Sequence, residues 1–230
     1  MIFIHRRAPP SKLIRNESEW TARWQKIHLA KSGEKWCTGA AHDELKINLE
    51  LMTHGKCAFC ESQLDVASYL QIEHYHAKNH YPNRAFEWDN LFPICSVCNV
   101  TKGAENHKGE IIKPDNEDPE SFLQIDLENG HVEPQESLSL TSAIRAEKTI
   151  SSYGLNRPQL VEVRRKLLLT LLFCLDKASH EPADLIKQQL EPLFLSLNAQ
   201  YKLVIRQQLE DKGWGALSEA DRKWHALSGH

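Results

Sequence analysis

Apolar residues recur at helical spacing in the first quarter of the chain. Trp20, Trp24 and Ile27 follow one another at intervals of four and three residues, which places them on one face of a helix. Asn16, followed three residues later by Glu19, is typical of a helix start. The pattern therefore predicts a helix that begins near Asn16 and buries its tryptophans. The same spacing predicts a second helix from Leu45, Leu49 and Met52.

The composition and the apolar pattern of the chain change near residue 109 and again near residue 140. Residues 109–136 are rich in acids and prolines, and Asn129–Gly130 between short apolar stretches predicts a small hairpin. From about residue 140 the pattern is helical, and Ser218 with Asp221 resembles a capping box for the last helix. The longest apolar run, Leu167–Leu175, is far shorter than the roughly 20 residues of a membrane span. The predicted helices cover residues 142–152, 158–177, 183–198, 200–212 and 218–226.

These patterns predict an α+β protein of two parts. A first domain of residues 1–136 contains a small β/α core at about residues 56–108, and a helical region follows at residues 137–230. With 230 residues, 41% of them hydrophobic and 26% charged, the composition is that of a soluble globular protein. No secretory signal is visible, so we expect a cytoplasmic protein with reduced thiols and no membrane partner.

Charge is distributed unevenly although the net charge is only −3. Residues 1–36 carry eight Lys or Arg against three Glu, whereas residues 109–136 carry nine acids against one Lys. A polyanion could therefore dock on the first segment or on residues 137–230, whose net charge is +3, and would be repelled by residues 109–136. The alternative is that these charges only decorate solvated faces.

Four of the six cysteines form two C-x-x-C pairs, Cys57 with Cys60 and Cys95 with Cys98. Two such turns can direct four thiolates at one ion, which predicts a structural zinc site with no open coordination position. The alternative, two redox disulfides, needs a βαβ context that the sequence does not show. The 34 residues between the pairs exceed the usual zinc-finger gap, so a further element is inserted there.

The insert and the second cysteine pair carry side chains that suit phosphodiester hydrolysis. Glu73, His74, Asn90, Asn99 and Lys102 lie on a segment that the zinc site would tether at both ends. Histidine can take a proton from water at neutral pH, and carboxylate and carboxamide oxygens suit a Mg²⁺-class ion. Lysine supplies a positive charge for phosphate.

An acidic–His pair (Glu73–His74), then Asn90–Leu91, then the segment Cys95–Gly103 with its C-x-x-C-N-x-x-K-G pattern follow one another along the chain. In this order the motifs resemble those of the HNH endonucleases, whose fold is the zinc-stabilised ββα-metal core. The resemblance implies that His74 is the general base, that Glu73 and Asn99 hold a catalytic Mg²⁺ or Mn²⁺, and that Asn90 fixes the loop and the base. It also implies that Lys102 faces phosphate, with Lys78 and His76 as further phosphate contacts. His76 and Ala77 stand where relatives tend to have Arg and Pro, which leaves the contacts of that strand open.

The resemblance narrows to the PtuB-like HNH subunit of Septu-type and retron-associated anti-phage defence systems. Residues that carry it are spread over much of the chain: Arg6, Arg7, the 55–61 segment, Ile72, Trp88, Asp118–Glu120, Gly130, Thr149 and Gly154–Arg157. It implies a nucleic-acid substrate and an ABC-type, PtuA-like ATPase partner. In retron-associated systems it also implies a reverse transcriptase with its RNA–DNA product. The chain has no Walker A motif, so any ATP dependence would come from that partner.

Two other functions stay open on the sequence alone. The same active site could cleave structured RNA such as tRNA, because the motifs do not separate RNA from DNA. A zinc-stabilised adaptor without catalysis would share the four cysteines but would not need Glu73, His74 and Asn99 together.

Overall fold

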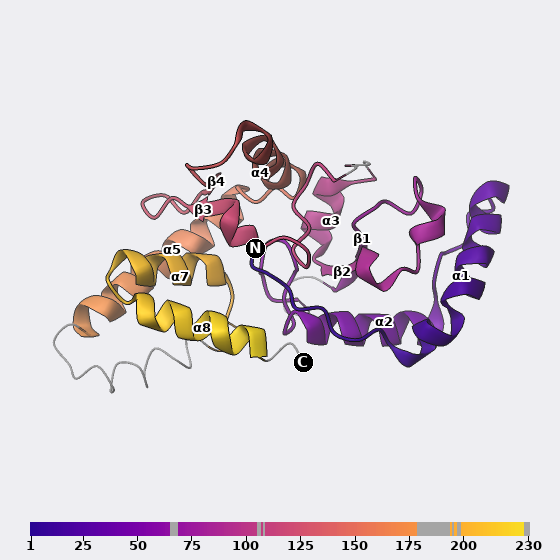
Figure 1. The fold of residues 1–230 in the computed structure, drawn as a ribbon, viewed down its shortest axis with the longest axis horizontal. Coiled ribbons are helices and arrows are strands. Elements are labelled where there is room, and N and C mark those ends of the chain that lie inside the picture. Colours follow the sequence, from indigo (N-terminus) through magenta and orange to yellow (C-terminus); the bar gives the residue numbers. More distant parts are fainter. Residues whose placement is uncertain are drawn as a thin grey trace.

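The computed structural model describes residues 1–64, 69–104, 109–178 and 199–227, together with residues 107, 194 and 196. Figure 1 shows helix α1 at one end of the long axis and helices α7 and α8 at the other, with the short strands β1 and β2 between them. Within the described residues no helix is long and apolar enough to cross a membrane.

Helix α1 spans Ser11–Ala30 and helix α2 spans Gly39–Met52. The first prediction placed the start of α1 near Asn16, which is wrong by five residues. The helix begins directly after Pro10, and Asn16 lies inside it, where its side-chain amide donates to the Lys12 carbonyl at 2.7 Å. Trp24 is buried as expected, whereas Trp20 is half-buried.

The insert between the cysteine pairs folds as a β-hairpin followed by a helix. Strand β1 (Gln71–His74) pairs antiparallel with strand β2 (Leu91–Ile94), with His74 opposite Leu91. Helix α3 (Ser96–Lys102) follows β2 directly, after its N-cap Cys95. The loop between the strands contains the 3₁₀ turns η1 (Pro82–Arg84) and η2 (Trp88–Asn90). This is the predicted ββα arrangement, and the α+β fold class is confirmed.

The predicted hairpin is also present. Turn η3 (Pro119–Ser121) leads into strand β3 (Leu123–Ile125), which pairs antiparallel with β4 (Val132–Pro134). Gly130 has a φ of +78° between the two strands, a conformation that glycine adopts without steric cost.

Four of the five predicted C-terminal helices lie within the described residues, and the structure places each of them: α4 (Leu140–Ser152), α5 (Pro158–Ala178), α7 (Lys202–Asp211) and α8 (Gly215–Leu227). The predicted helix at 183–198 lies outside the described residues, apart from 194 and 196. The capping-box assignment was wrong, because α8 begins at Gly215 and Ser218 lies within it. The Ser218 hydroxyl donates to Glu210 at 2.9 Å.

Most of the core is one continuous cluster that draws residues from Met1 to Val204. It therefore includes residues from both predicted domains, and their division near residue 136 stays a prediction. A smaller cluster packs Leu171 and Leu175 of α5 against Ile205 and Leu209 of α7. The apolar run of α5 is thus buried on one face, while Leu169 and Phe173 are 64% and 63% exposed on the other.

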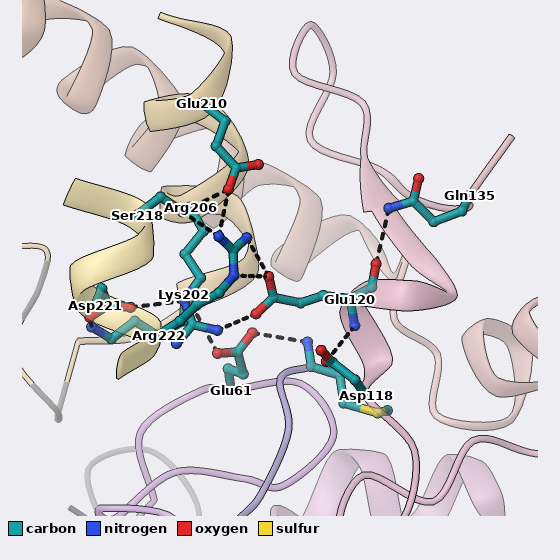
Figure 2. Close-up of polar contacts among 11 residues, drawn as sticks. Glu61, Asp118, Glu120, Gln135, Lys202, Arg206, Glu210, Ser218, Asp221 and Arg222 are labelled. Carbon is teal, nitrogen blue, oxygen red and sulfur yellow. Dashed lines mark hydrogen bonds and ion pairs between the residues drawn. The ribbon is translucent and has the colours of Figure 1, made fainter. Parts of the chain in front are cut away.

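A network of buried charges joins α7 and α8 to turn η3 (Figure 2). Asp221 accepts from Arg206 Nε at 2.8 Å and also pairs with the Lys202 ammonium group. Glu120 pairs with Arg206 and accepts from Arg222 Nη2 at 2.7 Å. The side chains of Lys202, Arg206 and Asp221 are at most 4% exposed, so each buried charge has an opposite charge beside it.

Removal of the carboxylate at the centre of this network should destabilise the fold strongly. We expect Asp221→Ala to lower the free energy of unfolding by about 3–5 kcal/mol, because Lys202 and Arg206 would keep buried charges without that partner. Urea unfolding followed by circular dichroism measures this change. As a control, Glu219→Ala removes an exposed partner of Lys223 on the same helix and should leave the midpoint unchanged. Equal midpoints for both variants would contradict the assignment.

Candidate metal centre and active site

The four paired cysteines converge at one point in the interior. Their sulfur atoms all lie within 4.8 Å of one another, and Cys60 Sγ lies 3.8 Å from Cys95 Sγ. A tetrahedral zinc ion with Zn–S bonds of about 2.3 Å places its sulfurs about 3.8 Å apart, so the cluster fits that ion. All four thiols are free and buried. The predicted ligand set is therefore assembled and could hold a metal ion.

Two donors approach the sulfur atoms from outside the cluster. The Cys98 backbone N–H donates to Cys95 Sγ at 3.4 Å, and Arg157 Nη1 donates to Cys98 Sγ, also at 3.4 Å. Burial alone would lower the pKa of Arg157, but the sulfurs of Cys98 and Cys60 raise it above its usual range. Such outer contacts stabilise negative charge on metal-binding thiolates. The sequence pointed to Arg157 through the family resemblance but gave it no role.

Strand β1 and helix α3 bring the predicted catalytic residues to one hollow. This solvent-open hollow has an empty volume of about 420 Å³, and five of its lining residues were predicted from the sequence: Glu73, His74, Lys78, Asn99 and Lys102. The first two residues end β1, and the last two lie on α3. The hairpin register and the start of α3 directly after its N-cap Cys95 thus place His74 and Lys102, which are 28 positions apart in the chain, beside one another.

His74 is held in one tautomer by the chain around it. Its Nε2 lies 3.0 Å from the carbonyl oxygen of Ala85, and a carbonyl only accepts, so Nε2 carries the proton. Nδ1 is therefore the atom with a free lone pair. Burial and, to a smaller extent, the positive charge of Lys78 lower the pKa of His74 to about 3, so the imidazole is neutral at pH 7. The Trp36 ring packs edge-on against it, with centroids 4.5 Å apart.

Glu73 is a buried carboxylate with an ion-pair partner. Lys102 Nζ contacts its Oε1, and the side chains are 1% and 6% exposed for Lys102 and Glu73 respectively. Burial raises the pKa of Glu73, and the ammonium groups of Lys102 and Lys78 oppose that rise. Burial likewise lowers the pKa of Lys78. The predicted phosphate lysine Lys102 is therefore engaged with the predicted metal ligand Glu73.

Asn90 lies beneath the loop instead of in the hollow. Its carboxamide oxygen accepts from the His76 N–H at 2.6 Å, and its Nδ2 donates to the carbonyls of His76 and Arg84 at 3.1 and 2.9 Å. These bonds join both ends of the loop that follows His74. The predicted role of Asn90 in fixing the loop and the base stays a prediction.

Two further residues differ from the sequence-based picture. Asn99 Nδ2 donates to Gln71 Oε1 at 2.6 Å, so Gln71 orients the carboxamide that was predicted as a metal ligand. No motif pointed to Gln71, because its contact depends on the packing of α3 on β1. His76 is not brought to the hollow, and its ring packs against Tyr75 and Tyr81 instead.

The hollow has the donor set for a hard divalent cation. Glu73 Oε1 is buried, and its contact in the structure is the ammonium group of Lys102. Asn99 lines the same hollow, and carboxylate and carboxamide oxygens suit Mg²⁺ or Mn²⁺. The residues present therefore fit such an ion.

Comparison with known proteins agrees with this geometry. Residues 57–105 match the family model described as HNH endonuclease, and this range contains the four cysteines and every residue predicted for the hollow. A Septu protein PtuB from Bacillus thuringiensis is 35% identical over 127 residues, which are 54% of this chain. A Septu protein PtuB from Bacillus mycoides (strain KBAB4) is 28% identical in an alignment of 204 positions that covers 73% of this chain.

The chain spans 46% of the length of the first relative and 67% of the second. The expected resemblance to HNH endonucleases, and to PtuB-like proteins among them, is confirmed by these matches. Residues 57–105 therefore resemble an HNH endonuclease domain, and the cysteine cluster within them could hold a metal ion.

Zinc content tests the cysteine cluster directly. We expect one zinc ion per chain. The Cys57→Ser variant should lose both the ion and the folded core, because the apparent free energy of binding structural zinc, on the order of 10–16 kcal/mol, is coupled to folding. Elemental analysis and circular dichroism measure the two effects. Cys37 and Cys174 lie outside the cluster, so Cys37→Ser and Cys174→Ser should keep both metal and fold. Freshly purified protein without zinc would contradict the assignment.

Proposed function

We propose that this chain is a metal-dependent HNH endonuclease that hydrolyses phosphodiester bonds of nucleic acid as the effector of an ATPase-coupled anti-phage defence system in the cytoplasm. The observation that carries the proposal is the arrangement of His74 and Glu73. The Ala85 carbonyl holds the proton on His74 Nε2, which leaves Nδ1 as a proton acceptor on a hollow that also contains a buried carboxylate. A zinc-stabilised adaptor without catalysis would need neither feature.

In this proposal each residue of the hollow has one task. His74 takes a proton from the attacking water, and it is neutral at pH 7 because burial depresses its pKa. Glu73 and Asn99 hold the divalent cation, which when bound stabilises the negative charge that develops on the phosphoryl group. Lys78 and Lys102 add positive charge that attracts an anionic phosphate. Gln71 and Asn90 act on the reaction through the residues that they orient.

Loss of the base should be separable from loss of the cation. We expect His74→Ala to lower the cleavage rate by about 10²–10⁴ with zinc and fold intact, and added Mg²⁺ or Mn²⁺ should not restore it, since a proton acceptor is missing. Glu73→Gln and Asn99→Ala should instead raise the metal concentration needed for half-maximal rate. Cleavage of duplex DNA, single strands and tRNA at graded metal concentrations measures both effects.

The same assay separates the alternatives. His80 is exposed and close in sequence but does not line the hollow, so His80→Ala should cleave at the wild-type rate. A folded, zinc-loaded His74→Ala protein with wild-type activity would contradict the mechanism. No cleavage of any polymer, with or without the ATPase, would favour the adaptor. Preferred cleavage of tRNA would favour the ribonuclease.

Helix α5 carries the surface that we propose for the ATPase partner. Leu169 and Phe173 are exposed one turn apart, beyond the buried face that packs on α7. An exposed apolar pair on a long helix suits a partner surface, and the resemblance to PtuB-like proteins implies a PtuA-like ATPase. In a retron context the same complex would also include the reverse transcriptase and its RNA–DNA product.

Charge placed on this surface should abolish the complex. We expect Leu169→Glu with Phe173→Glu to lose co-elution with the ATPase on size-exclusion chromatography, because burial of two carboxylates opposes docking. Ile47 and Leu51 form a matched exposed pair one turn apart on α2, and Ile47→Glu with Leu51→Glu should keep the complex. The opposite pattern would place the docking surface on α2.

A further inference from the structure

A second hollow lies beside the active site, between α1 and the segment that leads into α2. It is open to solvent, and its empty volume, open solvent included, is about 420 Å³. Its lining combines aromatic and basic side chains: Trp20, Arg23, Lys35, Trp36 and Phe86, together with Cys37. The sequence predicted a core role for Trp20, which the structure instead places half-buried at this hollow.

The aromatic side chains form one continuous cluster that reaches the catalytic base. Trp20 and Trp36 each pack on Phe86, with ring centroids 5.5 and 4.9 Å apart. Trp36 also packs edge-on against His74, at 4.5 Å and 78°. His74 lines the first hollow and Trp36 lines the second, so this ring contact connects the linings of the two hollows.

The charged side chains at the rim are free to meet an anion. Arg23 is 71% exposed, and its ion pair with Glu34, at 3.4 Å, is exposed on both sides and therefore weak. Lys35 is exposed as well. Both belong to the basic first segment, residues 1–36, whose helix α1 lies at the end of the molecule away from α7 and α8 (Figure 1).

We propose that this hollow binds an unpaired nucleobase of the substrate strand, next to the phosphate that is cleaved. The base stacks on the tryptophans, and Arg23 and Lys35 contact the flanking phosphates. Aromatic rings beside cations are the combination that binds single-stranded nucleic acid, because every unpaired base offers a ring face and every linkage a negative charge. In a duplex those ring faces are covered by neighbouring bases. The inference rests on the proposed nuclease function and adds the strand state of its substrate.

Strand binding without catalysis tests the hollow itself. The full zinc-loaded chain, without added Mg²⁺ or Mn²⁺, is titrated into a labelled 15-nucleotide single strand and into the matching duplex, with fluorescence anisotropy as the readout. We expect Arg23→Glu with Lys35→Glu to weaken single-strand binding at least tenfold. Trp20→Leu keeps apolar volume but loses the ring face, so it should weaken binding on the order of tenfold as well.

A matched control removes the effect of overall charge. Arg15 and Lys26 are exposed on α1, which also carries Arg23, but they do not line the hollow. Arg15→Glu with Lys26→Glu changes the net charge equally and should weaken binding less than threefold. Equal losses for the two double variants, or duplex binding as tight as single-strand binding, would overturn the proposal.

Hydrolysis of a base-free substrate separates this inference from the proposed function. Bis(4-nitrophenyl) phosphate carries a phosphodiester and no nucleobase, so the wild-type chain should hydrolyse it with Mn²⁺ whether or not the hollow binds a base. If the wild type hydrolyses this substrate and the Arg23→Glu, Lys35→Glu variant binds the single strand as tightly as the wild type does, the base site is overturned and the nuclease function stands. Absence of hydrolysis by the wild type, with the strand-binding loss present, would contradict the nuclease and support the strand site.

Discussion

Four sulfur atoms that must reach one coordination sphere constrain most of this structure. The Cys57–Cys60 turn and the start of α3 lie 34 residues apart, yet their sulfurs are within 4.8 Å. With both ends joined there, the chain between them has to leave and return, and it does so as the β1–β2 hairpin. This closure places the end of β1 against α3, so the residues of the hollow owe their proximity to cysteines that take no part in the proposed chemistry.

The hollow also shows how burial sets the chemical state of its residues. A buried carboxylate and a buried ammonium group are each costly alone, and Glu73 and Lys102 compensate one another. His74 solves the same problem without a charge, because burial keeps it neutral and one backbone carbonyl satisfies its N–H. A neutral imidazole with a defined free nitrogen is the state that a general base requires. The same burial therefore serves both stability and the proposed reaction.

Much of the fold and the site could be predicted from the sequence, for reasons that are local. Three signals depend only on residues close together in the sequence: the cysteine spacing, the apolar periodicity of α4 and α5, and Asn129–Gly130. The structure confirms both helices and the β3–β4 hairpin. Helix starts were predicted less well, because Asn16 and Ser218 bond within helices instead of capping them. Gln71 and Trp36 could not be found at all. Their contacts to Asn99 and His74 exist only once separate elements pack together.

The C-terminal helices are more than an appendage to this core. Tyr153 stacks on Phe59, which lies between Cys57 and Cys60, with ring centroids 3.8 Å apart. Glu61, directly after that cysteine pair, has a φ of +61°, a conformation that costs a non-glycine residue on the order of 1–3 kcal/mol. Its carboxylate accepts from the Lys202 N–H at 2.9 Å, and the same helix anchors the buried network of Figure 2. The turn that presents two cysteines of the cluster, Cys57 and Cys60, is therefore held from α7. Helix α5 packs against α7, and α7 contacts Glu61, which directly follows Cys60. A partner bound on α5 would therefore be connected to the cysteine cluster through α7.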